Sequence, residues 1–210
     1  MAFRLIDKRT WPRTEYFDHY MDVCRIRYST TVNADVTALK GQQLYPAMLW
    51  CLTKTVNEME EFRMALSPEG PGVFDQVVPS YTLFNQEKKN FVSVWTEVTG
   101  SYEEFLTAYE EDAAKYSSST RFSPKGNRPE NCYDVSMVPW FSFSQFHYDI
   151  QGDGAWLLPT FTMGKCFEES GRRMMPLAIQ VHHAVCDGYH IGQFVEKLQG
   201  HINGLCKSNF

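Results

Sequence analysis

The 210-residue chain lacks the features that mark membrane-spanning, secreted or nucleic-acid-binding proteins. It has no run of about 18 apolar residues, and its first residues lack the apolar stretch and small-residue cleavage site of a signal peptide. It has no basic cluster, and its formal net charge is −5. These absences argue against a bilayer, an anionic membrane surface or nucleic acid as the main partner. We therefore expect a cytoplasmic protein.

The cysteines show no pattern of metal ligands or disulfide partners, because none of the six belongs to a CxxC pair. A disulfide framework or a zinc knuckle would show tighter spacing. We expect reduced thiols and no bound metal. The cysteines lie at positions 24, 51, 132, 166, 186 and 206.

The composition is that of a folded globular protein. Hydrophobic residues make up 43% of the chain and aromatic residues 15%, which is enough for a sizeable core, whereas charged residues make up only 21%. No repeat, low-complexity tract or long linker divides the chain. The length and composition predict one domain over residues 1–210.

Four segments carry helix signals. Pro12 and Pro46 suit first turns, Ser101 and Glu104 form a capping box, and an amphipathic stripe follows the turn at Asp187-Gly188. The apolar positions of these segments are, in order, Phe17, Tyr20 and Val23; Leu49, Trp50, Leu52, Val56 and Met59; Phe105, Tyr109, Ala113 and Tyr116; and Ile191, Phe194, Val195, Leu198, Ile202 and Leu205.

Extended segments alternate with these helices. The predicted strands are Phe91–Trp95, a region from Tyr133 to Ile150 interrupted by Pro139, and Trp156–Phe167 and Met174–His182, which residues 168–173 join as a hairpin. The polar residues 117–131 predict a long surface loop. The pattern favours an α/β sandwich in which helices cover a mixed or antiparallel sheet.

The most informative stretch is Val181–Gly188, at the end of a predicted strand. Its two histidines and one aspartate fill a core poorly, because buried imidazole and carboxylate groups need hydrogen-bond partners. Histidine has a pKa suited to a general base near neutral pH. The residues alone leave three other interpretations open: a structural His–Asp contact, a Cys186–His183 nucleophile pair, and a metal site. The metal site would use His182, His183, Asp187 and His190, although adjacent histidines in a strand point to opposite faces.

The string His182-His183-x-x-x-Asp187-Gly188 resembles the HHxxxDG signature of CoA-dependent acyltransferases. The longer run from Pro176 to Gly188 resembles the chloramphenicol acetyltransferase family in particular. Six further stretches resemble that family, in its order and spacing. They are Trp11-x-Arg13-x-Glu15-x-Phe17, Tyr45-Pro46, Glu61-Phe62-Arg63, Pro129-Glu130-Asn131, Val135-Ser136-x-x-Pro139-Trp140 and Phe161-Thr162-Met163-Gly164-Lys165.

The resemblance implies a catalytic role for four residues. His183 matches the general base, and Ser136 matches the serine that stabilises the tetrahedral oxyanion. Asp187 and Arg13 match an ion pair that orders the active-site turn. The implied fold is a two-layer sandwich of a mixed β-sheet covered by helices.

The resemblance also implies how the substrates are held. Thr162 matches a threonine that binds the intermediate through water, and Trp140 matches a CoA contact. Tyr20, Phe91 and Phe146 match aromatic residues that line the drug pocket. For the aromatic residues, ordinary core packing is the competing interpretation.

The implied reaction is direct transfer of the acetyl group of acetyl-CoA to the 3-hydroxyl of chloramphenicol. The family forms homotrimers with active sites between subunits and holds no permanent cofactor. Cys24 and Tyr148 stand where the family often has aliphatic pocket residues, Cys166 replaces a common aromatic beside the CoA tunnel, and Ser123 lies in a shifted segment. Two alternatives remain: an HHxxxDG acyltransferase with another acceptor, and a non-catalytic module that binds the drug.

Overall fold

A mixed β-sheet forms one layer of the molecule in the computed structural model, which describes residues 2–149 and 154–205. Strand β7 runs parallel to both of its neighbours, and the remaining strand pairs are antiparallel. The predicted mixed sheet is therefore confirmed. Its strand order is β2 (Arg27–Asp35), β10 (Arg172–His182), β8 (Thr160–Gly164), β7 (Cys132–Val138), β5 (Val78–Asn85) and β6 (Asn90–Trp95), with β9 (Phe167–Glu169) paired to the start of β10.

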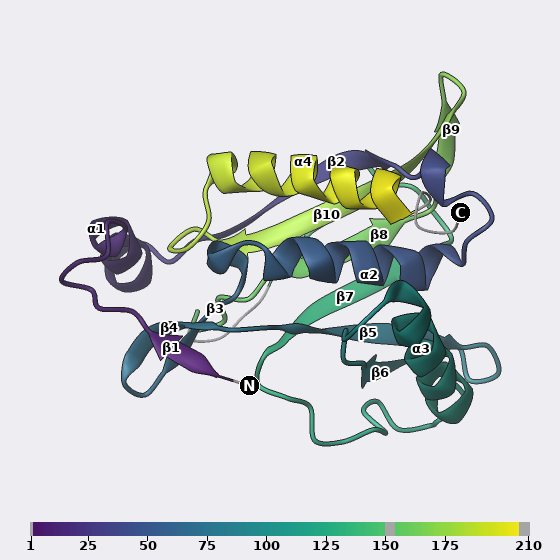
Figure 1. Cartoon of the computed structure of the whole chain (residues 1–210), viewed down its shortest axis with the longest axis horizontal. Coiled ribbons are helices and arrows are strands. Elements are labelled where there is room, and N and C mark those ends of the chain that lie inside the picture. The colour runs from purple at the N-terminus through teal and green to yellow at the C-terminus, as the bar shows by residue number, and fades with distance from the viewer. Residues whose placement is uncertain (1, 150–153, 206–210) are drawn as a thin grey trace.

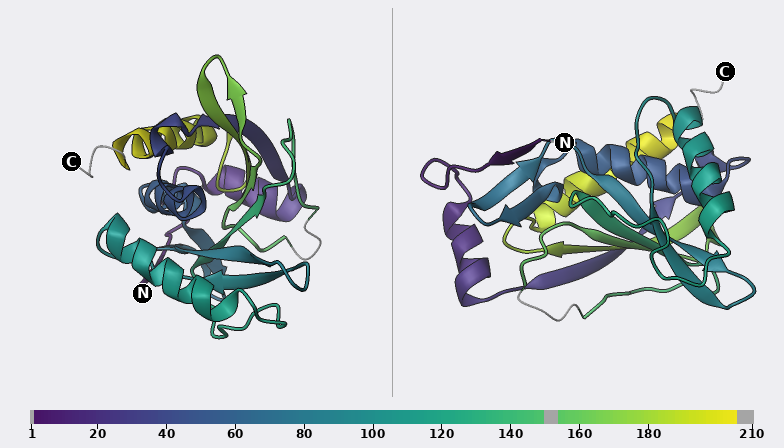
Figure 2. Two further views of the ribbon diagram at one scale, coloured as in Figure 1. Left: turned by 90° about the vertical axis from the view of Figure 1, so that its right-hand side faces the viewer. Right: turned by 90° about the horizontal axis from the view of Figure 1, so that it is seen from below.

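Three helices cover one face of this sheet (Figure 1; Figure 2, left). They are α2 (Leu44–Asn57), α3 (Tyr102–Tyr116) and α4 (Gly188–Leu205). The core lies between the two layers, where Phe194 of α4 stacks on Phe62 and on Phe161 of β8. The predicted α4 stripe is confirmed at five buried positions, because its apolar side faces the sheet: Ile191, Phe194, Leu198, Ile202 and Leu205.

The helix starts differ in how well local sequence defines them. The capping box is present, since Glu104 N donates to Ser101 Oγ and Ser101 N donates to Glu104 Oε2. Helix α2 starts two residues before Pro46, and α1 (Thr14–Asp18) starts two residues after Pro12. Helix α1 then continues as a π-helical turn, His19–Val23. Val23, the last apolar position of the first predicted helix, ends this turn and is 75% exposed.

A second, three-stranded sheet was not predicted. It has the order β1 (Phe3–Leu5), β4 (Gly70–Phe74) and β3 (Met64–Ser67), and it lies at one end of the molecule (Figure 1). Gly72 is required in it, because a Cβ there would lie 2.5 Å from the Phe3 ring. Two 3₁₀ turns, Thr37–Leu39 and Glu60–Phe62, complete the regular elements of the described chain.

The remaining predictions concern loops and termini. Residues 117–131 form no helix or strand, as predicted, whereas the extended region expected from Tyr133 ends at Val138. Ile150, the predicted end of that region, and Cys206 lie outside the described residues. The five described cysteines are free thiols. Among the described helices, none is long and apolar enough to span a membrane.

Candidate active site

The HHxxxDG motif forms the connection between β10 and α4. Strand β10 ends at His182, and the chain reverses at once, because the N–H groups of Val185 and Cys186 both donate to the His182 carbonyl. Helix α4 begins at Gly188. The backbone N–H of His183, the residue directly after β10, donates to Ile26 O at 2.9 Å. The motif is thus a tight turn at the end of β10 that carries both imidazole rings.

His182 is a structural residue by its geometry. Its side chain is buried, and its Nδ1 accepts a hydrogen bond from the Ala184 N–H at 3.1 Å. Burial, together with the charges of Arg27 and Arg25, lowers the pKa of His182 to about 4. His182 is therefore neutral at neutral pH and is enclosed by protein.

His183 has the geometry of an oriented base. Its Nδ1 lies 3.2 Å from the Cys186 carbonyl oxygen. A carbonyl oxygen only accepts, so Nδ1 carries the proton and the lone pair of the neutral ring is on Nε2. Tyr20 stacks on the ring at 4.1 Å between centroids, and Tyr28 meets it edge-on at 5.1 Å. These contacts fix the plane of the imidazole.

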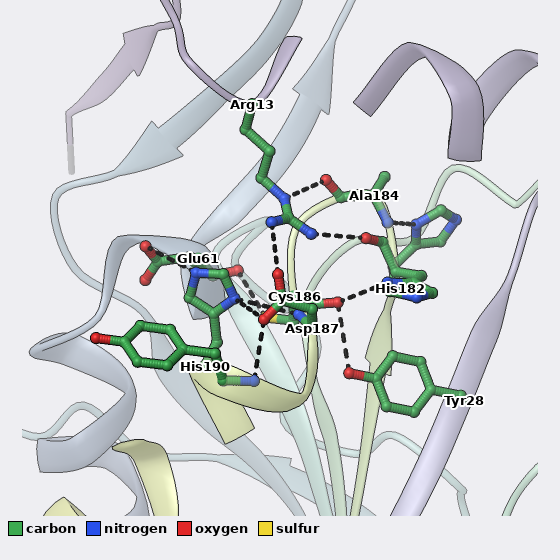
Figure 3. A network of polar contacts seen from close by, with 10 residues as sticks. Arg13, Tyr28, Glu61, His182, Ala184, Cys186, Asp187 and His190 are labelled. Carbon is green, nitrogen blue, oxygen red and sulfur yellow. Dashed lines mark hydrogen bonds and ion pairs between the residues drawn. The ribbon is translucent and has the colours of Figure 1, made fainter. Parts of the chain in front are cut away.

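Arg13 connects α1 to the motif by three hydrogen bonds (Figure 3). Its guanidinium donates to Asp187 Oδ2 at 2.9 Å, to Ala184 O at 2.9 Å and to His183 O at 3.0 Å. The expected ion pair between Arg13 and Asp187 is therefore present. Partial burial alone would raise the pKa of Asp187, but the hydrogen bond from Arg13 and the charge of its guanidinium help to hold that pKa below its usual value.

The alternative chemistries of this stretch gain no support. Cys186 is buried and donates to Glu61 O at 3.6 Å, and burial raises the pKa of its thiol well above the ordinary value, so it is a poor nucleophile. His190 turns its Nδ1 to Asp187, 3.0 Å from Oδ1. Among residues 2–149 and 154–205, no group of three His, Cys, Asp or Glu side chains could hold a metal ion.

A contact between His190 and Glu61 extends the polar network. The sequence did not predict that these two residues pair. Glu61 was noted only within a family motif, and His190 only as a possible metal ligand. In the structure, His190 Nε2 lies 3.7 Å from Glu61 Oε1, while its Nδ1 accepts from the Asp187 N–H at 3.2 Å (Figure 3). His190 thus braces Asp187 on the side away from Arg13.

A second group of polar side chains surrounds Ser136 on β7. Ser136 Oγ lies 3.1 Å from Thr162 Oγ1 and 3.1 Å from the Tyr148 hydroxyl. Ser136 and Thr162 are register partners on adjacent strands, which explains their proximity. The Phe146 ring packs edge-on against Tyr148, with 5.2 Å between centroids. Ser136, Thr162 and Phe146 therefore belong to one cluster.

Trp140 and Phe91 belong to a third group. Trp140 packs edge-on against Phe84 at 4.9 Å and against Phe91 at 5.9 Å. Trp140 is 51% exposed, so it is not a core residue. An exposed tryptophan beside two phenylalanines is a suitable surface for a flat ring system.

The strand register separates His183 from Ser136 within one chain. Ser136 pairs with Thr162, and Thr162 pairs with Ala178. His183 lies five residues beyond Ala178, which corresponds to about 17 Å along the strand, with about 10 Å more across two strand spacings. A hollow of about 680 Å³ is lined by His182 and Tyr28 near the motif and by Tyr148 near Ser136. The register therefore keeps the backbones of His183 and Ser136 of one chain well apart.

The architecture and the motif turn together define the class of protein. A solved structure described as chloramphenicol acetyltransferase superposes with a TM-score of 0.87 at 19% identity, covering 96% of this chain and all of that one. The dihydrolipoamide acetyltransferase of Azotobacter vinelandii superposes at 0.67 with 16% identity, covering 90% and 86%. The fold is that of the CoA-dependent acyltransferases, which confirms the predicted fold class.

Sequence comparison then identifies the family. The family profile described as chloramphenicol acetyltransferase matches residues 1–199. A chloramphenicol acetyltransferase of Clostridium perfringens is 46% identical over 206 residues, which cover 97% of this chain and all of that protein. One of Vibrio anguillarum is 44% identical, with 98% and 96% covered. The chain belongs to the chloramphenicol acetyltransferase family, as its motifs predicted. It is an acyltransferase of a family that uses acetyl-CoA as co-substrate.

Proposed function

We propose that the enzyme moves the acetyl group of acetyl-CoA to the 3-hydroxyl of chloramphenicol and thereby inactivates the antibiotic. The observation that carries this proposal is the hydrogen bond from His183 Nδ1 to the Cys186 carbonyl, which leaves Nε2 as the base. The full-length similarity to chloramphenicol acetyltransferases supports the choice of acceptor. Acetyl-CoA is a cytoplasmic metabolite, which supports a cytoplasmic location for the proposed reaction.

The proposed mechanism is a direct transfer within a ternary complex. His183 Nε2 takes the proton of the acceptor hydroxyl while its oxygen attacks the thioester carbonyl carbon. The resulting tetrahedral intermediate collapses as the carbon–sulfur bond breaks. The leaving thiolate of CoA takes the proton back from His183, so the products are the acetyl ester and free CoA thiol. No acyl-enzyme forms.

Ser136 is the proposed donor to the oxyanion of that intermediate. The negative charge develops on the former thioester oxygen, and a fixed hydroxyl stabilises it more than a mobile one. Thr162, which lies 3.1 Å from Ser136, is proposed to bind the intermediate through water. Arg13 and Asp187 keep the turn that carries His183 in its reactive position.

The aromatic residues have proposed roles in substrate binding. Tyr20 covers the His183 ring and Phe146 lies beside the Ser136 cluster, so both are placed to line an acceptor site. Phe91 packs against Trp140, and we assign Phe91 to the pocket and Trp140 to CoA.

A homotrimer with active sites at its subunit interfaces is the proposed assembly. The strand register argues for this arrangement, because it places His183 and Ser136 of one chain too far apart for one reaction centre. A cyclic trimer would bring His183 of one subunit to Ser136 of the next, so that each interface carries one site. Arg13 and Asp187 act in the subunit that supplies His183.

The test of the proposed function follows thiol release from acetyl-CoA in the presence of chloramphenicol. The wild-type enzyme should release thiol in step with formation of the 3-acetyl ester. His183→Ala should abolish release without loss of the fold, whereas His182→Ala should lose less activity. Thiol release with other alcohols but not with chloramphenicol would support a different acceptor. Tight binding of chloramphenicol without thiol release would support a non-catalytic binding module.

A further inference from the structure

The hydroxyl of Tyr148 lies 3.1 Å from Ser136 Oγ, which also lies 3.1 Å from Thr162 Oγ1. The sequence alone singles out Tyr148 only because it stands where the family often has an aliphatic pocket residue. The structure shows that the departure puts a hydrogen-bonding group on the side chain proposed to stabilise the oxyanion.

Tyr148 is held in place by a pair of hydrogen bonds to its backbone. The side-chain amide of Gln180, which is buried on β10, accepts from Tyr148 N at 3.1 Å and donates to Tyr148 O at 2.8 Å. The two bonds imitate one rung of a β-ladder in a segment that has no regular structure. The edge-on contact with Phe146 limits rotation of the phenol ring. Gln180 and Phe146 therefore aim the Tyr148 hydroxyl at Ser136.

The supply of protons then fixes the direction of the hydrogen bonds. Ser136 has one hydroxyl proton and two lone pairs. An oxyanion only accepts, so Ser136 must give its single proton to the oxyanion in the tetrahedral intermediate. The Tyr148 and Thr162 hydroxyls must then both donate to Ser136. Donation by Tyr148 polarises the Ser136 O–H bond and strengthens its donation to the oxyanion.

We propose that Tyr148 is a positioning residue for acetyl transfer, acting as the outer donor of a Tyr148–Ser136–oxyanion chain. The proposal rests on the proposed function of Ser136. The proton of Tyr148 is shared with Ser136 and is not transferred, so no further reactant is needed. Because the oxyanion exists only in the transition state and intermediate, the effect belongs to kcat and not to substrate binding.

The experiment compares Tyr148→Phe with the wild-type enzyme by steady-state kinetics. The change removes one oxygen and keeps the ring against Phe146. We expect kcat to fall about two- to tenfold, the range for one neutral hydrogen bond, with the KM of both substrates unchanged. Tyr102→Phe removes a tyrosine hydroxyl from α3 and should leave kcat unchanged. An unchanged kcat in Tyr148→Phe, or a change confined to the KM of chloramphenicol, would overturn the proposal.

The same substitution in a Ser136→Ala background separates indirect from direct action. If Tyr148 acts through Ser136, Tyr148→Phe should cause no further loss in that background. An equal fold-loss in both backgrounds would mean that Tyr148 contacts the substrate itself, and the proposal would be wrong.

A third measurement does not depend on the identity of the acceptor. Slow hydrolysis of acetyl-CoA without any alcohol uses water as nucleophile and develops an oxyanion on the same thioester oxygen. Tyr148→Phe should lower this hydrolysis by the same factor as it lowers kcat, and unchanged hydrolysis would contradict the proposal. Wild-type turnover with chloramphenicol tests the proposed function, whereas the ratio of Tyr148→Phe to wild-type rates tests this inference, so the two can fail separately.

Discussion

Arg13 and Asp187 are 174 positions apart in the sequence, and Arg13 Nη1 lies 2.9 Å from Asp187 Oδ2. The same guanidinium also holds the carbonyl oxygens of His183 and Ala184. One side chain therefore satisfies three acceptors of the motif turn. An exposed ion pair stabilises a protein little, but this one fixes the backbone of the residue that we propose as the base.

Asp187→Asn and Arg13→Ala should each lower kcat, by up to about a hundredfold, because small displacements of a catalytic group are costly. We expect the double variant to have a kcat only slightly below that of the less active single variant, since both changes loosen the same turn. Thiol-release kinetics of the two single variants and the double variant measure this. Losses that multiply would show that the two residues act independently.

The stability of the protein should fall on mild acidification because of His182. Its pKa is about 4 when folded and about 6.5 in an unfolded chain. The unfolded state thus binds more protons between these values, so the His182 contribution is complete above pH 6.5 and is lost as the pH falls towards 4. His182→Asn keeps an acceptor for the Ala184 N–H but has no proton to bind.

The measurement is the urea midpoint of the wild type and of His182→Asn at pH 7 and pH 5, at one protein concentration. Other titrating groups are common to both proteins, so they cancel in the comparison. The wild-type midpoint should fall more than that of the variant. Equal falls in the two proteins would show that the pKa of His182 is not depressed in the folded state.

Ser136→Ala should lower kcat about ten- to a thousandfold while leaving the KM of both substrates nearly unchanged, as loss of an oxyanion donor does. Steady-state kinetics with each substrate varied in turn give these values. Ser136→Thr, which keeps a hydroxyl but adds a methyl group, serves as the partial control. An effect confined to the KM of chloramphenicol would make Ser136 a ground-state contact.

Local signals in the sequence predicted some elements well. The capping box at Ser101 and Glu104 acts within one helical turn, and the apolar stripe of α4 has helical spacing, so both could be recognised without knowledge of the fold. The small three-stranded sheet could not be recognised from local signals. Strand β4 contains Gly70, Pro71 and Gly72, which disfavour a strand locally, and only pairing with β1 and β3 stabilises it there.

The candidate site shows the same contrast. His183 and Asp187 lie four positions apart within one recognisable motif, whereas the Tyr148–Ser136 contact depends on a loop without regular structure. The loop conformation is imposed by Gln180, which is distant in sequence. Short-range periodicity carries no information about such a contact, and a resemblance to relatives carries none where the side chain departs from them.

In the proposed trimer, each active site combines His183 of one subunit with Ser136 of the next. The direct test mixes His183→Ala chains with Ser136→Ala chains. Each homotrimer carries only damaged sites. Every mixed cyclic trimer contains one interface at which an intact His183 faces an intact Ser136. With equal, random assembly, about a quarter of all sites should be intact.

The two variants are unfolded and refolded together, mixed trimers are verified by native mass spectrometry, and thiol release is measured with acetyl-CoA and chloramphenicol. Proteins refolded separately and then combined are the control. If the sites are shared between subunits, the activity should lie far above the sum of the two separate preparations and approach about a quarter of the wild-type rate. Verified mixed trimers with no gain over the control would contradict it and would place each active site within a single subunit.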